Sequence, residues 1–221
     1  MSYPINYPTP QGANIQIFEL GGSVSDWVKP QGASFVWFTL IGSGGAGSTG
    51  TGLGGGSGAV TNFMAPAFLM PDVLRITVGR GGQADANSGS DSRVVYQQKN
   101  SSGYTLLAAT GGSSVGGSAM TANAFAAMGF FQSTAGVEGN SSITAAQTTF
   151  LTGGGTAGSG VTNYGYTTPG GTGTGFFQTQ PIIVGLGGTG VDKDGGVGCG
   201  GGGTVVGFGK GGDGMVVIIT W

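Results

Sequence analysis

The hydrophobic residues of this chain come in short blocks that are rich in β-branched and aromatic side chains and bounded by Gly, Asn or Pro. Blocks of this length and composition are typical of β-strands. A series of short strands with turn signals between them favours an all-β fold, an antiparallel β-sandwich or jelly-roll-like core. The predicted strands cover residues 14–20, 34–41, 58–64, 73–78, 92–96, 104–108, 181–184, 204–208 and 215–220.

The pattern inside a block predicts how its strand is buried. Residues 35–41 and 215–219 are almost continuously apolar, which predicts two central strands that are covered on both faces. Residues 73–78 alternate instead, which predicts a half-exposed strand with one apolar face made of Leu74, Ile76 and Val78.

Helical periodicity is weak along the chain. Met120, Ala124 and Met128 recur at a spacing of four, behind Ser118 as a candidate N-cap. This spacing predicts one short helix over residues 119–128.

Glycine is the most abundant residue, at 52 of 221 positions, against a usual share of about 7%. Only 7% of the residues are charged and 38% are hydrophobic, which is the opposite of the composition that keeps a chain disordered. The glycines concentrate in tracts between the predicted strands: 42–58, 111–117, 153–160, 170–175 and 185–203.

Ordering these tracts is costly, because each glycine in regular structure loses roughly 0.5–1 kcal/mol relative to alanine. Twenty ordered glycines would cost on the order of 10–20 kcal/mol, which exceeds the stability of a typical domain. Either the tracts are mobile, or they pack backbone against backbone. Polyproline-II geometry has three residues per turn and no internal hydrogen bonds, so glycine segments in that form can bond laterally. We predict long glycine-rich loops that are partly polyglycine-II-like, with single large residues such as Leu53, Val191 and Val197 seated against the packed backbone.

The composition also argues against several function classes. The chain has no histidine, which removes the usual general base and the commonest metal ligand. Cys199 is the one cysteine and can form neither an intrachain disulfide nor a thiolate cage. The seven basic residues are scattered, so we expect no nucleic-acid binding. We expect no signal peptide and no membrane insertion, because neither a signal-like start nor an apolar run near 18 residues occurs.

One motif resembles a cofactor site. Residues 42–47 fit G-x-G-x-x-G directly after a predicted strand, as in dinucleotide-binding folds. Six more glycines follow in residues 48–58, where a helix is needed, and no acidic residue lies about 20 positions further on. We therefore predict no cofactor and no enzymatic activity.

The densest carboxylates are Asp192, Asp194 and Asp213. Asp192, Asp194 and Gly195 resemble a fragment of a calcium loop, but the third acidic position and the closing glutamate are missing. We interpret these aspartates as turn residues and predict no metal site. The alternative is a calcium or magnesium ion held together with backbone carbonyls.

We predict that residues 1–12 form an extended, proline-rich amino-terminal arm and that residues 13–221 form a single glycine-rich β-sandwich domain. Three prolines in seven residues favour an extended, polyproline-like arm without a core of its own. We predict that the arm anchors the protein on a neighbouring or partner chain, the alternative being a frayed terminus. The predicted anchoring residues are Tyr3, Pro4, Tyr7 and Pro8.

Aromatic residues outside the predicted strands are the remaining binding candidates. Aromatic side chains on rigid loops can stack on sugar rings or anchor in a protein pocket, and the alternative is burial under the glycine tracts. The strongest contact candidates are Tyr164 and Tyr166, followed by Phe176 and Phe177, and the rest of the set is Phe125, Phe130 and Phe131.

Several motifs follow one another in a characteristic order: Trp27, Lys29-Pro30, Gly32, Leu40-Ile41-Gly42, Gly54-Gly55-Gly56-Ser57-Gly58-Ala59, Ile76-Thr77-Val78-Gly79-Arg80-Gly81-Gly82, and Gly211-Gly212-Asp213-Gly214 before Val216-Val217-Ile218-Ile219. This order resembles the glycine-rich domain of bacteriophage tail-fibre and related virion proteins, over roughly residues 24–221. The resemblance implies a structural or receptor-binding virion part, commonly oligomeric, with glycine-rich segments at the host-facing end.

We therefore predict a non-enzymatic virion structural protein, a small tail-fibre, spike or tip component that takes part in host attachment. We expect it to be made in the host cytoplasm and carried in the virion, bound to other virion proteins through its arm. A homotrimer would supply the intersubunit burial that so glycine-rich a chain requires. Its loops would contact a bacterial surface glycan or an outer-membrane protein. The alternatives are a capsid-decorating, minor head or head-fibre protein and a free carbohydrate-binding module.

Overall fold

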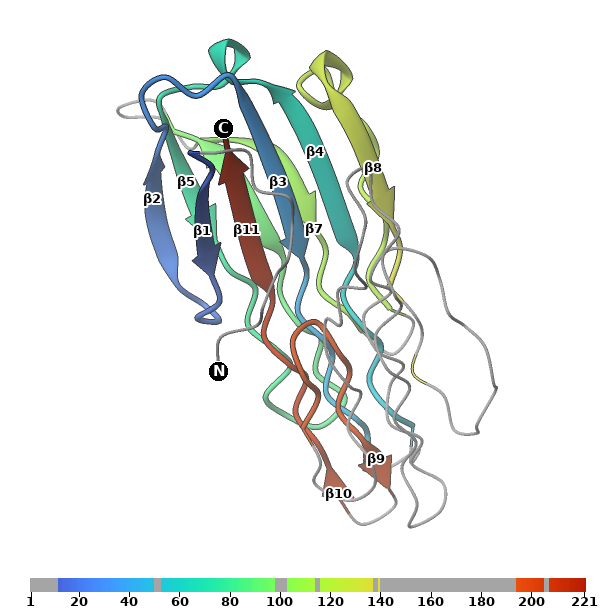
Figure 1. The fold of residues 1–221 in the computed structure, drawn as a ribbon. Coiled ribbons are helices and arrows are strands. Elements are labelled where there is room, and N and C mark those ends of the chain that lie inside the picture. The colour runs from blue at the N-terminus through green and yellow to red at the C-terminus, as the bar shows by residue number, and fades with distance from the viewer. Residues whose placement is uncertain are drawn as a thin grey trace.

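Two antiparallel sheets pack face to face in the computed structural model, which describes residues 12–49, 53–97, 103–113, 116–136, 139, 194–204 and 207–221 (Figure 1). The first sheet has five strands in the order β1-β11-β3-β4-β8. Its strands are β1 (Asn14–Phe18), β3 (Phe35–Ile41), β4 (Val60–Pro66), β8 (Phe130–Thr134) and β11 (Met215–Thr220).

The second sheet has four strands in the order β2-β5-β6-β7, and a separate two-stranded hairpin pairs β9 with β10. The fold is therefore the all-β, antiparallel sandwich that the sequence predicts. Among the described residues, no helix is both long and apolar enough to span a membrane. The elements are β2 (Val24–Val28), β5 (Val73–Thr77), β6 (Ser92–Tyr96), β7 (Tyr104–Ala109), β9 (Gly203–Thr204), β10 (Gly207–Phe208) and the 3-10 turns η1 (Ala67–Leu69) and η2 (Ala126–Met128).

The core lies between the two sheets and is filled by every second side chain of their strands. Val36, Phe38 and Leu40 of β3 are fully buried. Trp27 of β2 meets the Phe38 ring edge-on across the interface, with the ring centroids 5.8 Å apart. This T-shaped contact between the middle strand of one sheet and the edge strand of the other joins the two layers.

Aromatic contacts continue toward β8. Phe63 of β4 lies 6.4 Å from Phe38 and 4.9 Å from Phe125, measured between ring centroids. Phe125 is buried, and Phe131 of β8 packs against the same core. Of the aromatic residues that the sequence left as binding candidates, these two are therefore core residues.

Two strands are not predicted by the hydrophobic pattern. In β2, Trp27 points into the core, whereas Val24 and Val28 are exposed, so the apolar side chains lie on both faces and no alternation is visible. In β8, the adjacent Phe130 and Phe131 are followed by three polar residues, which does not suggest a strand.

The predicted helix over residues 119–128 is wrong. Residues 117–123 are not helical, and only the 3-10 turn η2 forms. Asn123 rather than Ser118 bonds the turn, since its Oδ1 accepts the Ala126 N–H at 2.8 Å. The Met120 backbone N–H donates to Ser133 Oγ at 2.8 Å, and its Sδ accepts the Ala108 N–H at 3.2 Å. These tertiary bonds to β7 and β8 take the place of helical ones.

Two further strand predictions need correction. Residues 204–208 are not one strand, because Gly203–Thr204 pairs antiparallel with Gly207–Phe208 and the chain reverses between them. β3 and β11 do lie inside the five-stranded sheet, but only one face of each is fully buried, and Phe35 is 39% exposed on the other. The predicted strand at 181–184 lies outside the described residues.

The alternation predicted for β5 is confirmed: Leu74, Ile76 and Val78 are buried, whereas Arg75 and Thr77 are partly exposed. Replacing Ile76 with alanine should therefore lower the free energy of unfolding by about 2–5 kcal/mol, because a fully buried side chain is removed. Thr77→Ala should change it by no more than about 0.5–1 kcal/mol. Urea titrations of the two variants measure the difference, and equal losses would contradict this strand register.

Candidate functional site

Six glycine-rich segments continue from the ends of the strands to one end of the molecule, beyond the two sheets (Figure 1). Each connects directly to a strand or to another of the segments. We call them together the glycine layer, and they comprise residues 42–48, 53–59, 79–90, 110–113, 194–204 and 207–214.

Segment 42–48 lies inside this layer and donates backbone hydrogen bonds to three other segments in rotation. Every third residue bonds the same neighbour, and the partner number falls as the donor number rises, so each pair of segments is antiparallel. Gly42, Gly45 and Ser48 donate to Ala59, Gly56 and Leu53 at 2.8–2.9 Å; Ser43 and Ala46 donate to Ser90 and Asn87 at 3.4 and 2.8 Å; Gly44 and Gly47 donate to Gly212 and Gly209 at 2.8 and 3.0 Å.

The outer segments follow the same three-residue spacing. Gly55 and Gly58 donate to Gly201 and Gly198, and Gly211 and Gly214 donate to Gly82 and Gly79, all at 2.8–2.9 Å. A repeat of three residues is that of the polyproline-II helix, whose backbone groups point outward in three directions. The hydrogen bonds of these segments have the same spacing of three residues, and the polyglycine-II-like geometry of the glycine tracts stays a prediction.

The layer requires glycine because its segments leave no room for a side chain, and not because its backbone has unusual dihedral angles. A Cβ atom on Gly44 would overlap the carbonyl oxygen of Cys199, and one on Gly55 would overlap that of Gly45. Of the described glycines only Gly12, Gly22, Gly32, Gly103, Gly116 and Gly198 have positive φ. Backbone segments therefore approach one another more closely than any side chain allows.

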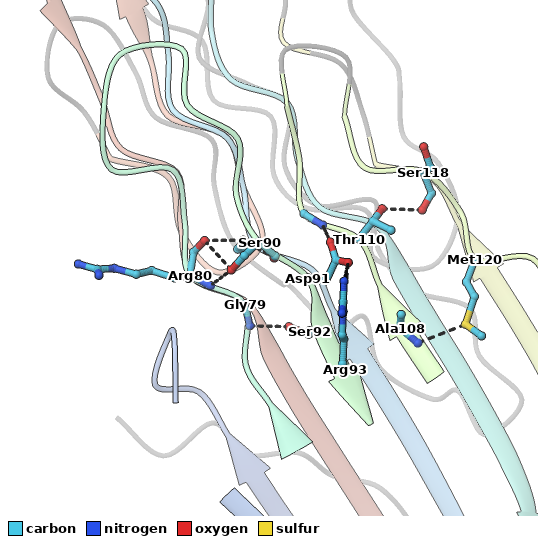
Figure 2. Close-up of polar contacts among 12 residues, drawn as sticks. Gly79, Arg80, Ser90, Asp91, Ser92, Arg93, Ala108, Thr110, Ser118 and Met120 are labelled. Atoms are coloured by element: carbon cyan, nitrogen blue, oxygen red, sulfur yellow. Dashed lines mark hydrogen bonds and ion pairs between the residues drawn. The ribbon is translucent and has the colours of Figure 1, made fainter. Parts of the chain in front are cut away.

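Two buried serines bond backbone groups where the layer meets the sheets, and Figure 2 shows Ser92 with the Gly79 N–H. The Ser92 hydroxyl donates to the Ile41 carbonyl at 2.6 Å and accepts the Gly79 N–H at 3.0 Å. The Ser43 hydroxyl lies 2.8 and 2.7 Å from the carbonyl oxygens of Arg80 and Ser90. Ser92 thus satisfies backbone groups of the buried residues Ile41 and Gly79, and Ser43 bonds segment 42–48 to both ends of segment 79–90.

Aspartates bond backbone N–H groups around the layer. Asp91 accepts from Gly111 at 3.0 Å through Oδ1 and from Arg93 Nη2 at 2.7 Å through Oδ2 (Figure 2). Three other aspartates each accept a hydrogen bond from a backbone N–H group through Oδ1: Asp85 from Thr49 at 2.7 Å, Asp194 from Lys210 at 2.8 Å and Asp213 from Gly81 at 2.9 Å.

Asp194 and Asp213 thus bond the backbone of neighbouring segments, rather than lying in simple turns, while Asp192 is outside the described residues. Within the described ranges, no group of three His, Cys, Asp or Glu side chains is placed to hold a metal ion. The carboxylates of Asp194 and Asp213 accept hydrogen bonds from backbone N–H groups.

The G-x-G-x-x-G motif at residues 42–47 is part of the layer. Its glycines contact the backbone of neighbouring segments: a Cβ on Gly42 would meet Thr110, and one on Gly47 would meet Gly202. The N–H groups that hold phosphate in a dinucleotide site are used here for bonds within the chain. Close packing explains the motif.

The binding residues predicted from the sequence lie outside the described residues. These are the arm residues Tyr3, Pro4, Tyr7 and Pro8 and the contact candidates Tyr164, Tyr166, Phe176 and Phe177. The sequence analysis in turn missed the roles of Ser43 and Ser92. Their signal is a small polar residue beside a strand boundary, since Ser92 begins β6 and Ser43 follows the end of β3 by two residues.

A family model described as a glycine-rich domain matches residues 19–221. The chain belongs to this family. The match on this glycine-rich domain includes every described strand except β1, and all six segments of the glycine layer. No curated protein matches the chain.

Two neighbouring glycines test the layer. Gly44→Ala should lower the free energy of unfolding by roughly 3 kcal/mol or more, because its methyl group would overlap backbone atoms of Cys199 that cannot move aside. Gly45→Ala should cost less than about 1 kcal/mol, because the atom nearest to the added methyl group is the Gly112 oxygen at 3.0 Å, and the lower entropy of the unfolded chain offsets part of the strain. Chemical denaturation compares the two, and similar losses would refute the tight packing.

Two serines test the junction. Ser92→Ala should lower stability by about 1–3 kcal/mol, because it leaves the buried Gly79 N–H without its acceptor and removes one bond from the Ile41 carbonyl. Ser90→Ala removes a similar bond from the Arg80 N–H, but Ser90 is exposed and water replaces it, so the loss should stay below about 0.5 kcal/mol. Thermal unfolding of both variants decides whether burial makes the difference.

Proposed function

We propose that the protein is a non-enzymatic structural component of a bacteriophage virion, a small tail-fibre, spike or tip protein that takes part in host attachment. The observation that carries the proposal is the glycine layer. It extends beyond the sandwich, and its hydrogen bonds run between segments from distant parts of the chain. Membership of the glycine-rich domain family agrees with this assignment.

The layer makes a rigid scaffold from backbone alone. Its segments are cross-bonded in three directions, and its glycines leave no room for side chains. A scaffold of this kind can hold loops at a fixed position far from the sandwich, and loops on rigid scaffolds are where binding residues concentrate.

The turn at residues 84–87 illustrates such a loop. The turn lies at the end of the layer away from the sheets. Near β3, Ser43 bonds Ser90; three residues further from the sheet, Ala46 bonds Asn87, which is the last residue of the turn. The turn is exposed, yet its Ala86 N–H donates to Gly47 at 2.9 Å. Ala86 has a φ of 52°, a strained conformation for a residue other than glycine. A turn held in this way presents a defined surface.

We further propose that three copies of the chain assemble, and that residues 1–12 bind the trimer to other virion proteins. A chain with this much glycine has fewer side chains to bury than an ordinary domain of its length. Association between copies supplies the missing burial. In this arrangement the loops of the layer face the bacterial surface and contact a glycan or an outer-membrane protein.

Imaging tests the location. Virions carrying an affinity tag on this protein, decorated with gold and viewed by electron microscopy, should show the label at the tail fibres, spike or tip. Label on the head would overturn the attachment role and indicate a decorating protein instead. A parallel preparation with the tag on the major capsid protein controls for access of the label.

Competition tests attachment. The purified protein, added in micromolar excess, should slow virion adsorption to host cells at least tenfold, because it occupies the receptor. The double variant Tyr164→Ala, Tyr166→Ala should lose this competition. Tyr104→Ala, which removes a 57% exposed tyrosine of β7 in the sandwich, should retain it. Undiminished competition by the double variant would remove the two tyrosines from the contact.

A further inference from the structure

The turn that follows β4 holds a phenylalanine in solvent. Phe68 of η1 is 81% exposed, the highest value among the large hydrophobic side chains in the described ranges. Its neighbours behave differently, because Ala67 and Met70 are buried and Leu69 packs against the core. Three of these four consecutive apolar residues therefore serve the fold. A polar residue at position 68 would suit a solvated turn equally well, so the fold does not account for the phenylalanine.

Lys29 fixes this turn in place. Its ammonium group donates to the carbonyl oxygens of Ala67 at 3.3 Å and Met70 at 2.9 Å, on either side of Phe68. The same group lies 2.8 Å from Asp72 Oδ1, and the Lys29 side chain is only 19% exposed. Hydrogen bonds from a charged donor are stronger than neutral ones. A ring on a turn held in this way loses little conformational freedom when it binds, which favours affinity.

Two exposed valines lie beside the turn. Val28 of β2 and Val73 of β5 pair directly across the two strands, and they are 62% and 50% exposed. Their chain neighbours are Lys29 and Asp72, which hold the turn, and the Lys29 N–H also donates to the Asp72 carbonyl at 2.8 Å. We call Val28, Phe68 and Val73 the end patch. Single exposed apolar residues are ordinary on protein surfaces, but a group of them around an aromatic ring marks an interaction site.

The end patch lies at the end of the sandwich opposite to the glycine layer, where Figure 1 shows η1 as the teal turn. The strand register agrees. Phe35, at the start of β3, pairs with Pro66 directly before η1, whereas Ile41, at the other end of β3, leads into the layer. β1 begins at the same end as η1, because Asn14 pairs with Thr220, the last residue of β11.

This position favours one kind of partner. Residues 1–12 join the sandwich at the start of β1, and therefore at the end that carries the end patch. In the proposed function the arm binds other virion proteins, whereas the loops of the layer, at the opposite end, face the host. A partner that holds the arm is thus close to the end patch.

The chemistry of the end patch agrees with a protein partner. Phenylalanine and valine side chains offer no hydrogen-bond donor or acceptor to the hydroxyl groups of a glycan. An apolar pocket in a protein accepts an aromatic ring, and surrounding apolar groups exclude water from the contact.

We propose that the protein docks on the virion through the end patch, with Phe68 inserted into an apolar pocket of the virion protein that the arm also binds. Phe68 is the anchor, the two valines exclude water around it, and Lys29 is a positioning residue. Two contacts on one partner bind more tightly than either alone, because the first brings the second into place. The inference rests on the proposed function and identifies a second contact with the same partner.

Binding to particles that lack this protein tests the end patch. Such particles come from a phage mutant that does not make the protein. They are mixed with the purified full-length chain at about 0.01–10 μM and pelleted, and the bound protein is quantified. Phe68→Ala should raise the dissociation constant roughly 30-fold, because an aromatic anchor is lost. Thermal unfolding should be unchanged, since the ring is exposed.

Leu20→Ala is the matched control for Phe68→Ala. Leu20 is 74% exposed and lies between β1 and β2, at the end of the sandwich near the layer. This variant also removes a large exposed apolar side chain, but from the opposite end, so it should bind the particles like the unmodified protein.

Lys29→Met tests the positioning role, because methionine keeps an aliphatic side chain but has no donor for the two carbonyl groups. Binding should weaken by roughly fivefold, a coupling of the usual size between neighbouring residues. In the Phe68→Ala background the same substitution should have almost no effect, since no ring is left to position. Equal losses in both backgrounds would show that Lys29 acts only on the fold.

The outcomes separate the two proposals. If Phe68→Ala binds the particles as tightly as the unmodified protein, the end patch is overturned and the virion role stands. If the unmodified protein does not bind the particles, both proposals fail. In the adsorption assay, Phe68→Ala should still compete like the unmodified protein, because its host-facing loops are intact. Lost competition together with retained particle binding would make Phe68 a receptor contact and overturn its docking role.

Discussion

The structure depends on close contact between bare backbone segments in the glycine layer. Segment 42–48 donates hydrogen bonds to the same neighbour at every third residue, and backbone carbonyl oxygens of adjoining segments occupy the space where Cβ atoms of Gly44 and Gly47 would lie. The entropy lost in ordering so many glycines is offset only when these bonds and contacts form together. A single methyl group at Gly44 acts on several segments at once, because the residue bonds one segment and touches another.

The sandwich positions this layer. β3 ends at Ile41 and continues as segment 42–48, and β11 begins at Met215, directly after segment 207–214. Because the strands are paired in a fixed register, the segments that leave them are already side by side. The buried Ser92 ties the junction, since it bonds β3 and the end of segment 79–90 near Gly79. The two parts therefore support each other: the sheets set the spacing, and the layer closes the open ends of the strands.

The sequence predicts the sandwich well where burial alone decides the structure. β-branched and aromatic blocks mark β3, β5, β6 and β11 with boundaries within one residue or less. The prediction fails where tertiary contacts override local pattern. In β2, Val24 and Val28 are exposed. Met120 and Met128 are spaced as in a helix, but the segment that contains Met120 is hydrogen-bonded to β7 and β8 instead.

The glycine tracts indicate that backbone segments pack closely. Which segments pair with each other depends on the order of the strands in the sheets, which no local sequence pattern contains. The predicted contact residues of the arm and of positions 164–177 remain predictions.

The position of segment 42–48 within the layer has a consequence for biosynthesis. Its neighbours include Gly209 and Gly212, which are made more than 160 residues after it. The amino-terminal half can therefore not reach its final arrangement on the ribosome before almost the whole polypeptide has been translated. Contacts so distant in sequence form slowly, and at a given stability a slower folding rate implies an equally slower unfolding rate. Such a protein would withstand long storage outside a cell better than its modest number of side-chain contacts suggests.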